Sequence, residues 1–513
     1  MPRSRRPSVD DTDHLLFGDM PDDSDPWGPA GPPEPPDFYE GPGDPWAEHA
    51  AEPDEEPERQ LVLRVDAESF VHVTQRGKVV IKPASAANTI TAAAAIGVAE
   101  DGRFWAEWDG VWQPAPRVIR NAMAASMGNN YVGNVVRDVE DIVRTLVPLF
   151  TVGPHPAYIN LRNGMLHSTS VDEFGLPSWA TWEFVGHRPQ VHSTVQLPHS
   201  WNPDAQCPRF DQFLAESLEP DAVPLAWEII AACLYSGIPV QRAVMLQGPP
   251  GCGKSQLLDV ITGLIGERAT THIPLQNLGE RFNVAQLHGK ALNVHADLDQ
   301  AGIGETGTFK TMVTGDTLTA EHKGQAPFTF TPFATLLFSA NEVPPSDDRS
   351  GAYTRRWAVL PFRQHVERSG APVRDLGKRV LLREAEGIIR KAVSSLPALL
   401  AHGDFGVLAR AQDDFNEKTD YLLTFVRSEL DFSDITHVTS SKVLTAALEA
   451  FKVATGNQHS RTTVKHLQPE LIKNGASKVT NHRLPDGSQV WGVRGVRLKN
   501  PAAAEAAVLW GKQ

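Results

Sequence analysis

The stretch Ala243–Ser255, AVMLQGPPGCGKS, constrains the fold of this chain more than any other part of the sequence. Five largely apolar residues, Ala243–Gln247, predict a buried strand, and the run SQLLDVITGLIG, which begins at Ser255, has the apolar spacing of a helix. The pattern G-x-x-x-x-G-K-[ST] starts between them at Gly248. A glycine-rich turn that joins a strand to a helix in this pattern predicts a phosphate-binding P-loop.

The physical basis of phosphate binding by such a loop is local. Glycines let backbone N–H groups close around phosphate oxygens, and the positive end of the new helix points at them. We expect the Lys254 ammonium to reach the β/γ-phosphates and the Ser255 hydroxyl to bind Mg²⁺, so ATP and Mg²⁺ are the predicted cofactors. The residues expected to contact the nucleotide are Gly248, Pro249, Pro250, Gly251, Cys252, Gly253, Lys254 and Ser255.

The composition argues against membrane and secreted classes. The apolar run most like a membrane span, Ala222–Val240, carries Glu228 and is expected to be a core helix beside the P-loop. The N-terminus has arginines without a following apolar segment, so we expect no signal peptide. The three cysteines are far apart in the sequence and form no metal-binding pair. These features predict a cytoplasmic protein with no membrane partner.

The net charge of −14 belongs to one segment. Residues 1–58 contain seventeen Asp/Glu and three Lys/Arg, whereas the rest of the chain has 45 of each. The acidity is therefore no argument against nucleic acid binding elsewhere. Residues 1–58 are rich in Pro and Gly and poor in aliphatic residues, so we expect a disordered acidic tail. The triplet Asp-Pro-Trp occurs twice in it, at 25–27 and 44–46, either by coincidence or as a pair of docking motifs.

The pattern of apolar and turn residues divides the rest of the chain into three regions. Residues 59–210 alternate short strands and helices and are expected to be a mixed α+β region. Residues 211–400 begin with two helices and then alternate strand and helix, which predicts an α/β domain with a mostly parallel sheet. Residues 401–513 are expected to form a helical linker and a basic domain. The predicted fold class is α/β around the P-loop.

The last region has the order helix, helix, strand, strand over residues 437–500, which is typical of a winged-helix module. The expected helices are Ser441–Ala454 and Arg461–Lys473, and the expected strands are Ala476–His482 and Gln489–Val496. This part contains ten Lys/Arg and three Asp/Glu, so it is basic, whereas the tail of residues 1–58 is acidic. A basic module of this kind favours nucleic acid binding.

Polar residues follow two further apolar strands downstream of the P-loop. The strand Ala291–Ala296 ends in Asp297-Leu298-Asp299, and alternation along a strand can place both carboxylates on one side. Asp297 is the expected metal-side carboxylate, and Asp299 is the second candidate or a water-orienting group. The strand Ala334–Ala340 ends in Asn341, whose amide can orient the attacking water or simply form a turn. Two arginines, Arg355 and Arg356, precede a third strand and form either a surface patch or a finger that acts on another subunit.

The order of the segments GPPGCGKS, LNVHADLD, FKTMVTGDTLTAEHKG, TLLFSANEVPP and RRWAVLPF resembles the superfamily 3 helicases, above all the primase-helicase branch of phages and poxviruses. YINLRNG and WNPDAQCP resemble the segment that precedes the helicase core in that branch. The resemblance implies that Asp297 is the motif B carboxylate, Asn341 the motif C sensor, and Arg355 or Arg356 the arginine finger. The residues between motifs B and C include Lys310, Gly315 and Asp316.

The resemblance also implies an AAA+-like ATPase core in residues 211–400 and a homo-hexameric ring that translocates on single-stranded DNA. The expected enzyme is therefore an ATP-dependent DNA helicase of phage or mobile-element replication, with a replication protein as a possible partner of the acidic tail. Acidic residues are often adjacent in motif B, whereas Leu298 separates Asp297 from Asp299, so the water-activating residue stays open. No primase site is visible before residue 200.

A basic hairpin is the expected DNA contact. Thr317–Glu321 and Pro327–Thr331 flank a tip that contains His322 and Lys323. One such tip per subunit would line the pore of a ring and hold backbone phosphates without reading sequence. The alternative for these residues is an ordinary exposed turn. For the whole chain, the alternatives are an origin-binding or loading ATPase that does not unwind DNA, and a protein-remodelling AAA+ ATPase.

Overall fold

The computed structural model describes residues 63–500 except 77, 236, 238–239, 297, 299–306, 343–350, 364–374, 420, 455–461 and 484–488. The acidic tail with both Asp-Pro-Trp triplets and the predicted carboxylates Asp297 and Asp299 lie outside the described residues. The chain divides into two units, and every described residue belongs to the second, Trp46–Gln513. Among the described residues, no helix is long and apolar enough to cross a membrane.

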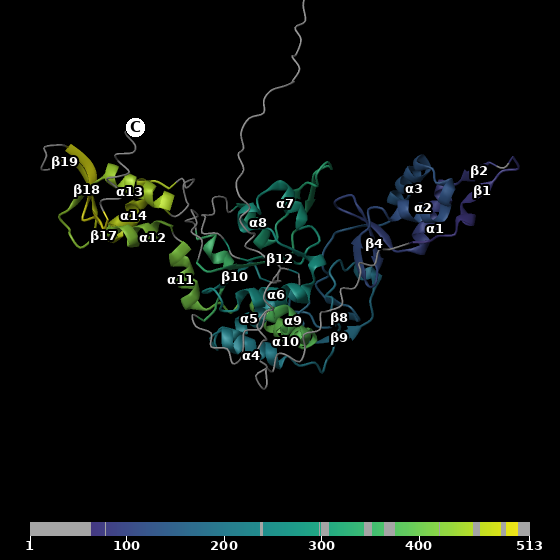
Figure 1. Cartoon of the computed structure of the whole chain (residues 1–513), viewed down its shortest axis with the longest axis horizontal. Coiled ribbons are helices and arrows are strands. Elements are labelled where there is room, and N and C mark those ends of the chain that lie inside the picture. Colours follow the sequence, from purple (N-terminus) through teal and green to yellow (C-terminus); the bar gives the residue numbers. More distant parts are fainter. Residues whose placement is uncertain are drawn as a thin grey trace, which may run out of the picture. The chain divides into compact units, whose positions relative to one another are not determined.

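The N-terminal region packs three helices on a four-stranded sheet of order β5-β4-β3-β6 (Figure 1, purple and blue). Asp109 and Gly110 link β4 to β5 with φ of +53° and +81°, the positive values that a tight hairpin turn favours. Its elements are β1 (Val71–Val73), β2 (Val79–Ile81), α1 (Pro83–Ala93), β3 (Ile96–Ala99), β4 (Phe104–Trp108), β5 (Val111–Pro114), α2 (Val118–Met127), α3 (Gly133–Leu146) and β6 (Leu149–Phe150).

A second, antiparallel sheet has the order β7-β8-β9. Beside it, the segments YINLRNG and WNPDAQCP contact each other. The side-chain amide of Asn163, in YINLRNG, donates to the carbonyl of Trp201 at 3.1 Å, and the Trp201 N–H donates back to Asn163 Oδ1 at 2.8 Å. Two helices, α4 and α5, follow in the chain. These elements are β7 (Tyr158–Leu161), β8 (Gly164–Ser168), β9 (Trp182–Val185), α4 (Pro208–Ser217) and α5 (Val223–Tyr235).

The central sheet has five strands in the order β11-β12-β15-β10-β16, and all neighbouring strands are parallel. Its strands are β10 (Ala243–Gln247), β11 (Thr270–Thr271), β12 (Leu292–His295), β15 (Thr335–Ala340) and β16 (Trp357–Pro361). Their near-continuous apolar sequences fit strands that are buried on both faces. The expectation of a mostly parallel α/β sheet is confirmed. Because β15 lies between β10 and β12, the carboxyl ends of three strands adjoin.

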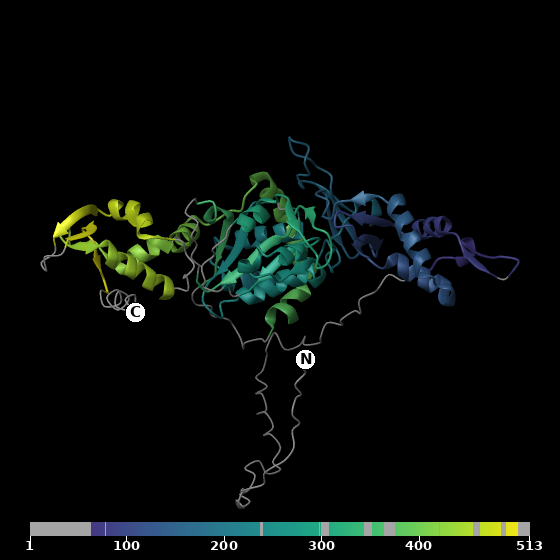
Figure 2. The same cartoon turned by 90° about the horizontal axis from the view of Figure 1, so that it is seen from above.

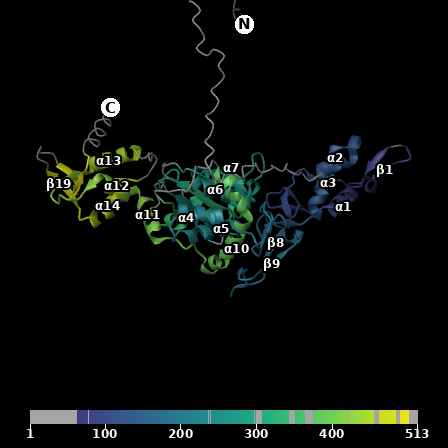
Figure 3. The ribbon, with the colours of Figure 1, turned by 60° about the horizontal axis from the view of Figure 1, so that its bottom comes forward.

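Successive residues of β10 point to opposite faces and enter two different cores. Val244 and Leu246 pack against α5, α6 (Lys254–Ile265), α9 (Leu376–Arg379) and α10 (Ala385–His402). Ala243 and Met245 belong to the core formed with α7 (Arg281–Gln286), α8 (Gly307–Thr314), β13 (Leu318–Ala320) and β14 (Phe328–Phe330). Figure 1 shows the two groups of helices on opposite sides of the strands, and Figure 3 shows α4, α5 and α10 side by side.

The C-terminal part has the expected order of two helices and two strands, with a third strand completing the sheet β18-β20-β19 (Figure 2, yellow). Leu444 and Leu448 of α13 pack with Leu467 and Leu471 of α14 in one core. The elements are α11 (Ala409–Thr419), α12 (Tyr421–Glu429), β17 (Leu430–Asp431), β18 (Val438–Ser440), α13 (Ser441–Ala454), α14 (Val464–Lys473), β19 (Ser477–Arg483), β20 (Gln489–Arg494) and β21 (Arg497–Leu498).

Candidate active site

The P-loop joins β10 to α6 at the carboxyl edge of the central sheet. Gly251 and Gly253 have φ of +79° and +112°, values that glycine adopts readily and other residues do not. A Cβ on Gly248 would lie 2.8 Å from the Cβ of Phe362 and 3.0 Å from the Sγ of Cys252. Backbone conformation therefore favours glycine at positions 251 and 253, and close side-chain packing favours it at 248. The loop ends at the amino terminus of α6, the kind of site that stabilises a phosphate.

The Lys254 ammonium is held inside this loop by oxygen atoms. It donates to the carbonyls of Gly248 and Pro249, at 2.7 and 2.9 Å, and to Oδ1 of Asn341 at 3.0 Å. Only 6% of the residue is exposed, and a buried charge needs such acceptors because its desolvation is costly. The positive charge is thus held inside the loop for which the sequence predicts phosphate binding.

Asn341 reaches Lys254 because of the strand order. Ala340, the last residue of β15, lies opposite Gln247, the last residue of β10, and accepts a hydrogen bond from Gly248 N–H at 3.3 Å. The residue after β15 must therefore lie beside the first residues of the P-loop. This adjacency brings together two candidate residues that the sequence had separated by 87 positions.

The segment around Asp297 is described only in part. β12 pairs with β15, and the Leu298 N–H donates to the carbonyl of Ser339 at 2.9 Å, so this segment continues alongside the strand that ends in Asn341. Asp297 and Asp299 themselves are outside the described residues, and their roles stay predictions.

A cavity of about 350 Å³ lies beside Ser255, between α6 and the end of β12. Asp259 follows Ser255 by one helical turn and faces this cavity. Burial raises the pKa of the Asp259 carboxyl, although the Lys378 ammonium lies 3.7 Å from its Oδ1. The cavity offers oxygen atoms of the kind that Mg²⁺ prefers. Its lining residues are Ser255, Leu258, Asp259, Thr262, Glu267, His272, Val294, His295, Ala296 and Lys378.

Arg355 and Arg356 are adjacent in sequence but differ in environment. Both lie on a short 3-10 turn, Thr354–Arg356, which leads directly into β16. The Arg355 side chain is exposed at the surface. The Arg356 guanidinium is half-buried and donates to the carbonyl of Ala352, just before the turn, at 2.8 Å. Of the two arginines, Arg355 is therefore the one presented outwards.

The basic hairpin forms as expected, with β13 and β14 paired in antiparallel register. Lys323 is exposed at its tip. The ring of His322 instead stacks on Phe328, with centroids 5.0 Å apart, and its Nε2 lies 3.9 Å from Oδ2 of Asp101. The two residues predicted to bind DNA thus differ in exposure: Lys323 faces solvent, whereas His322 is partly buried against the N-terminal region.

His322 belongs to a polar cluster that joins three distant segments of the chain. Ligand atoms of Asp101, His288 and His322 lie within 4.8 Å of one another, a spacing that could hold a metal ion. The Arg103 guanidinium, however, bonds to Asp101 and has Nη2 at 3.5 Å from His288 Nδ1, so the cluster already has its cation. Burial, reinforced by Arg103, lowers the pKa of His322. No local sequence pattern links Asp101, His288 and His322, because the three residues are far apart along the chain.

The segment between the predicted motifs B and C contains a helix and a turn. Lys310 lies on α8, Gly315 follows it with a φ of +70°, and Asp316 accepts a hydrogen bond from the Thr314 hydroxyl at 2.5 Å. These residues lead directly into β13, so α8 precedes the basic hairpin in the chain.

Two family models match parts of the chain. The model described as "D5 N terminal like" matches residues 94–219. The model described as "Family of unknown function (DUF5906)" matches residues 246–356, a range that contains the P-loop, Asn341 and both arginines. A search of curated proteins found no match.

Several solved structures show a distant likeness. One is described as "The A form apo structure of NrS-1 C terminal region-CTR"; it is 13% identical over 79% of this chain and 97% of that chain, with a TM-score of 0.45. Another is described as "The apo structure of NrS-1 C terminal region (305-718)"; it is 13% identical over 80% of this chain and 99% of that chain, with a TM-score of 0.44.

Proposed function

We propose that this protein is an ATP-dependent DNA helicase of the superfamily 3 type, which translocates on single-stranded DNA as a ring during phage or mobile-element replication. The observation that carries the proposal is the contact between Lys254 of the P-loop and Asn341 at the end of β15. A phosphate cradle that touches a strand-end amide suits hydrolysis, because the amide can orient water against the γ-phosphate. The "D5 N terminal like" match supports a role in replication, since it covers the segment in which the sequence resembles primase-helicases.

The chemistry follows from the proposed roles. ATP binds with its β- and γ-phosphates in the P-loop and displaces carbonyl oxygens from the Lys254 ammonium. Asn341 orients the attacking water, and Asp297 or Asp299 accepts its proton. Ser255 and Asp297 would hold Mg²⁺, which when bound neutralises charge on the phosphates. Arg355 of a neighbouring subunit stabilises the γ-phosphoryl group as the bond to ADP breaks.

The DNA contact in this proposal is the tip of the β13–β14 hairpin. Lys323 is exposed there, and a ring of such lysines would neutralise backbone phosphates without reading sequence. His322 would act indirectly, because its contact with the carboxylate of Asp101 links the hairpin to the N-terminal region. ATP hydrolysis would then move the hairpin through α8, which precedes it in the chain.

The deciding experiment measures ATP hydrolysis of the full chain with and without single-stranded DNA, and unwinding of a forked duplex. We expect DNA to stimulate hydrolysis and unwinding to require ATP. Lys254→Ala is the matched negative control. Hydrolysis that DNA does not stimulate, together with no unwinding, would contradict the proposal and favour a protein-remodelling ATPase.

The second candidate function is an origin-binding or loading ATPase that does not unwind DNA. The basic C-terminal module favours it, because four exposed cationic side chains lie on α14 and β19: Lys465, Lys473, Lys478 and Arg483. This function predicts sequence-specific duplex binding that survives Lys254→Ala. A helicase instead shows little preference among duplex sequences.

A further inference from the structure

A guanidinium outside the proposed machinery holds the turn that carries Arg355. Arg242 lies just before β10, at the opposite end of that strand from the P-loop. Its Nη1 donates to the carbonyl of Arg355 at 2.8 Å and to the carbonyl of Trp357 at 2.9 Å. One nitrogen atom therefore fixes the backbone on both sides of Arg356.

The same guanidinium is anchored on its other edge by a carboxylate. Nε and Nη2 of Arg242 donate to the two carboxylate oxygens of Asp404, at 2.6 and 2.8 Å. Such a bidentate pair is a rigid geometry that a lysine cannot reproduce, because its ammonium has no planar fork. Asp404 lies two residues after the end of α10, so Arg242 connects the turn that carries Arg355 to the end of that helix as well as to β10.

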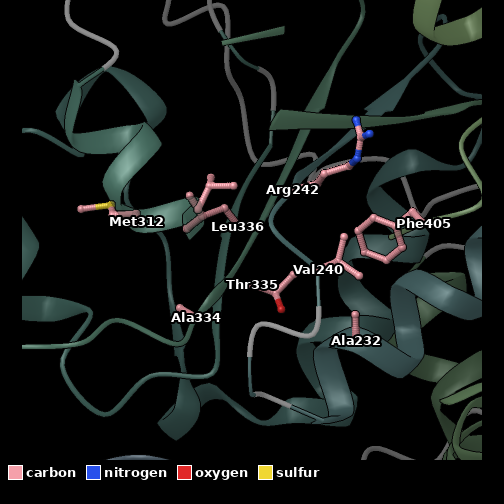
Figure 4. Close-up of a pocket in the computed structure, with 9 residues that line it drawn as sticks. Ala232, Val240, Arg242, Met312, Ala334, Thr335, Leu336 and Phe405 are labelled. Atoms are coloured by element: carbon pink, nitrogen blue, oxygen red, sulfur yellow. The ribbon is translucent and has the colours of Figure 1, made fainter. Parts of the chain in front are cut away.

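The packing beneath Arg242 leaves its side chain little freedom. The cavity under it holds only about 10 Å³, which is at the lower limit for one water molecule. Figure 4 shows the guanidinium nitrogens turned away from the apolar side chains that line this cavity, among them Val240 and Phe405. The guanidinium side chain is 18% exposed, so it is held mostly by protein atoms.

Residues of α11 make further contacts with the turn and with the start of β16. The side-chain amide of Gln412 donates to the carbonyl of Thr354 at 3.3 Å, and the ring of Phe415 lies 6.0 Å from that of the buried Trp357. The backbone of the turn is thus fixed from two sides, while the side chain of Arg355 stays exposed.

We propose that Arg242 is a positioning residue that aims Arg355 at the ATP of the neighbouring subunit; this inference rests on the proposed function. The Arg355 side chain is exposed, and the bonds of Arg242 fix the backbone from which it extends. A displacement of about 1 Å at a catalytic group can lower a rate by about 10²-fold. The bonds of Arg242 to the two carbonyls therefore matter for turnover, although Arg242 touches no nucleotide.

The first test compares Arg242→Lys with wild type in DNA-stimulated ATP hydrolysis. We expect kcat to fall by about 10–100-fold while KM for ATP stays unchanged, because each subunit's own P-loop is intact. Asp404→Asn, which weakens the anchor but keeps the guanidinium, should lower kcat less. The matched control is Arg120→Lys, since Arg120 makes a similar bidentate pair with Glu140 at 2.7 and 3.1 Å and should not affect hydrolysis.

The second test mixes two defective variants in one ring. Arg242→Lys subunits have intact P-loops, and Lys254→Ala subunits have intact finger turns, so the mixture should hydrolyse more ATP than the sum of the two alone. A mixture of Arg355→Ala with Lys254→Ala tests the finger role itself. Recovery with Arg355→Ala but not with Arg242→Lys or Asp404→Asn would overturn the positioning role. Recovery in neither mixture would refute the finger in trans, and this inference with it.

Discussion

Lys254 lies inside the P-loop, whereas Arg355 lies on a surface turn of the same domain. The Lys254 ammonium has three oxygen acceptors, and its residue is 6% exposed. The Arg355 side chain is exposed, and its hydrogen bond to Arg242 is made by its carbonyl oxygen. A cation that serves its own subunit can be oriented by side-chain contacts. In the proposed mechanism Arg355 serves another subunit, so its side chain stays available and the contacts that position it are made to its backbone.

The largest expected effect comes from removing the inner cation. Lys254→Ala should lower DNA-stimulated ATP hydrolysis by about 10³-fold or more, because the positive charge beside the β/γ-phosphates is removed. Steady-state hydrolysis is the measurement, and an unchanged melting curve is the control for folding. Substantial residual turnover would remove the basis for placing ATP in this loop.

Replacing the outer cation separates the two adjacent arginines. Arg355→Ala should lower kcat by about 10³–10⁵-fold without a change in thermal stability, as expected for an arginine finger. Arg356→Ala should instead destabilise the turn by about 1–3 kcal/mol, because its charged hydrogen bond to Ala352 is removed. Hydrolysis and melting of both variants distinguish these outcomes. Equal reductions of kcat for both would contradict the assignment to Arg355.

The side-chain amide of Asn341, which contacts Lys254, is the third target. Asn341→Ala should lower kcat by about 10²–10³-fold with little change in ATP affinity, because water loses its orienting group. Asn341→Asp should also weaken ATP binding, because a carboxylate would pair with Lys254 and compete with the phosphates. Nucleotide binding and single-turnover hydrolysis of both variants test this, and identical ATP affinities would argue against the Lys254–Asn341 contact in solution.

A smaller effect is expected at the hairpin. Lys323→Ala should weaken single-stranded DNA binding and unwinding while basal hydrolysis is kept. The slope of log affinity against log salt should fall by about 0.7 for each single-strand phosphate that the ring no longer neutralises. Gln325→Ala, at the same exposed tip, is the control. An unchanged salt slope with normal unwinding would place the DNA elsewhere.

The smallest effect concerns pH and His322. Burial lowers the pKa of His322, so the folded state favours the neutral ring. The stability that this contributes is present above the unfolded pKa of 6.5 and is lost as the pH falls below it. The melting temperature of the wild type should therefore fall between pH 7 and pH 5 by on the order of 1 °C more than that of His322→Gln. Parallel pH profiles would show that His322 is not buried against Asp101.

The parts of the fold that depend on local pattern could be predicted from the sequence. The strand Ala243–Gln247 is confirmed residue for residue, and the helix after the P-loop begins at Lys254, one residue before the expected start. The hairpin at 318–330 is likewise confirmed, because its strands lie within reach of one turn. The domain boundaries and the roles of the site residues stay predictions.

The sequence could not predict the partners of His322 or of Arg242. His322 was expected to share the basic tip with Lys323, yet its ring lies beside Asp101, more than 200 residues away. Arg242 was not selected at all, because a single arginine before a strand is a common surface residue. Its contacts with Asp404 and with the carbonyl of Arg355 follow from how α10 and β16 pack beside β10.

The sequence by itself determined the strand Ala243–Gln247, the glycine-rich turn and the helix that follows, because spacing and glycine conformation act over a few residues. Only the tertiary structure decided that Asn341 meets Lys254, since this depends on β15 lying between β10 and β12. It also decided which of two neighbouring arginines is presented, because the Ala352 carbonyl engages Arg356 and leaves Arg355 at the surface. Such choices depend on strand order and packing between distant segments, which no short sequence pattern encodes.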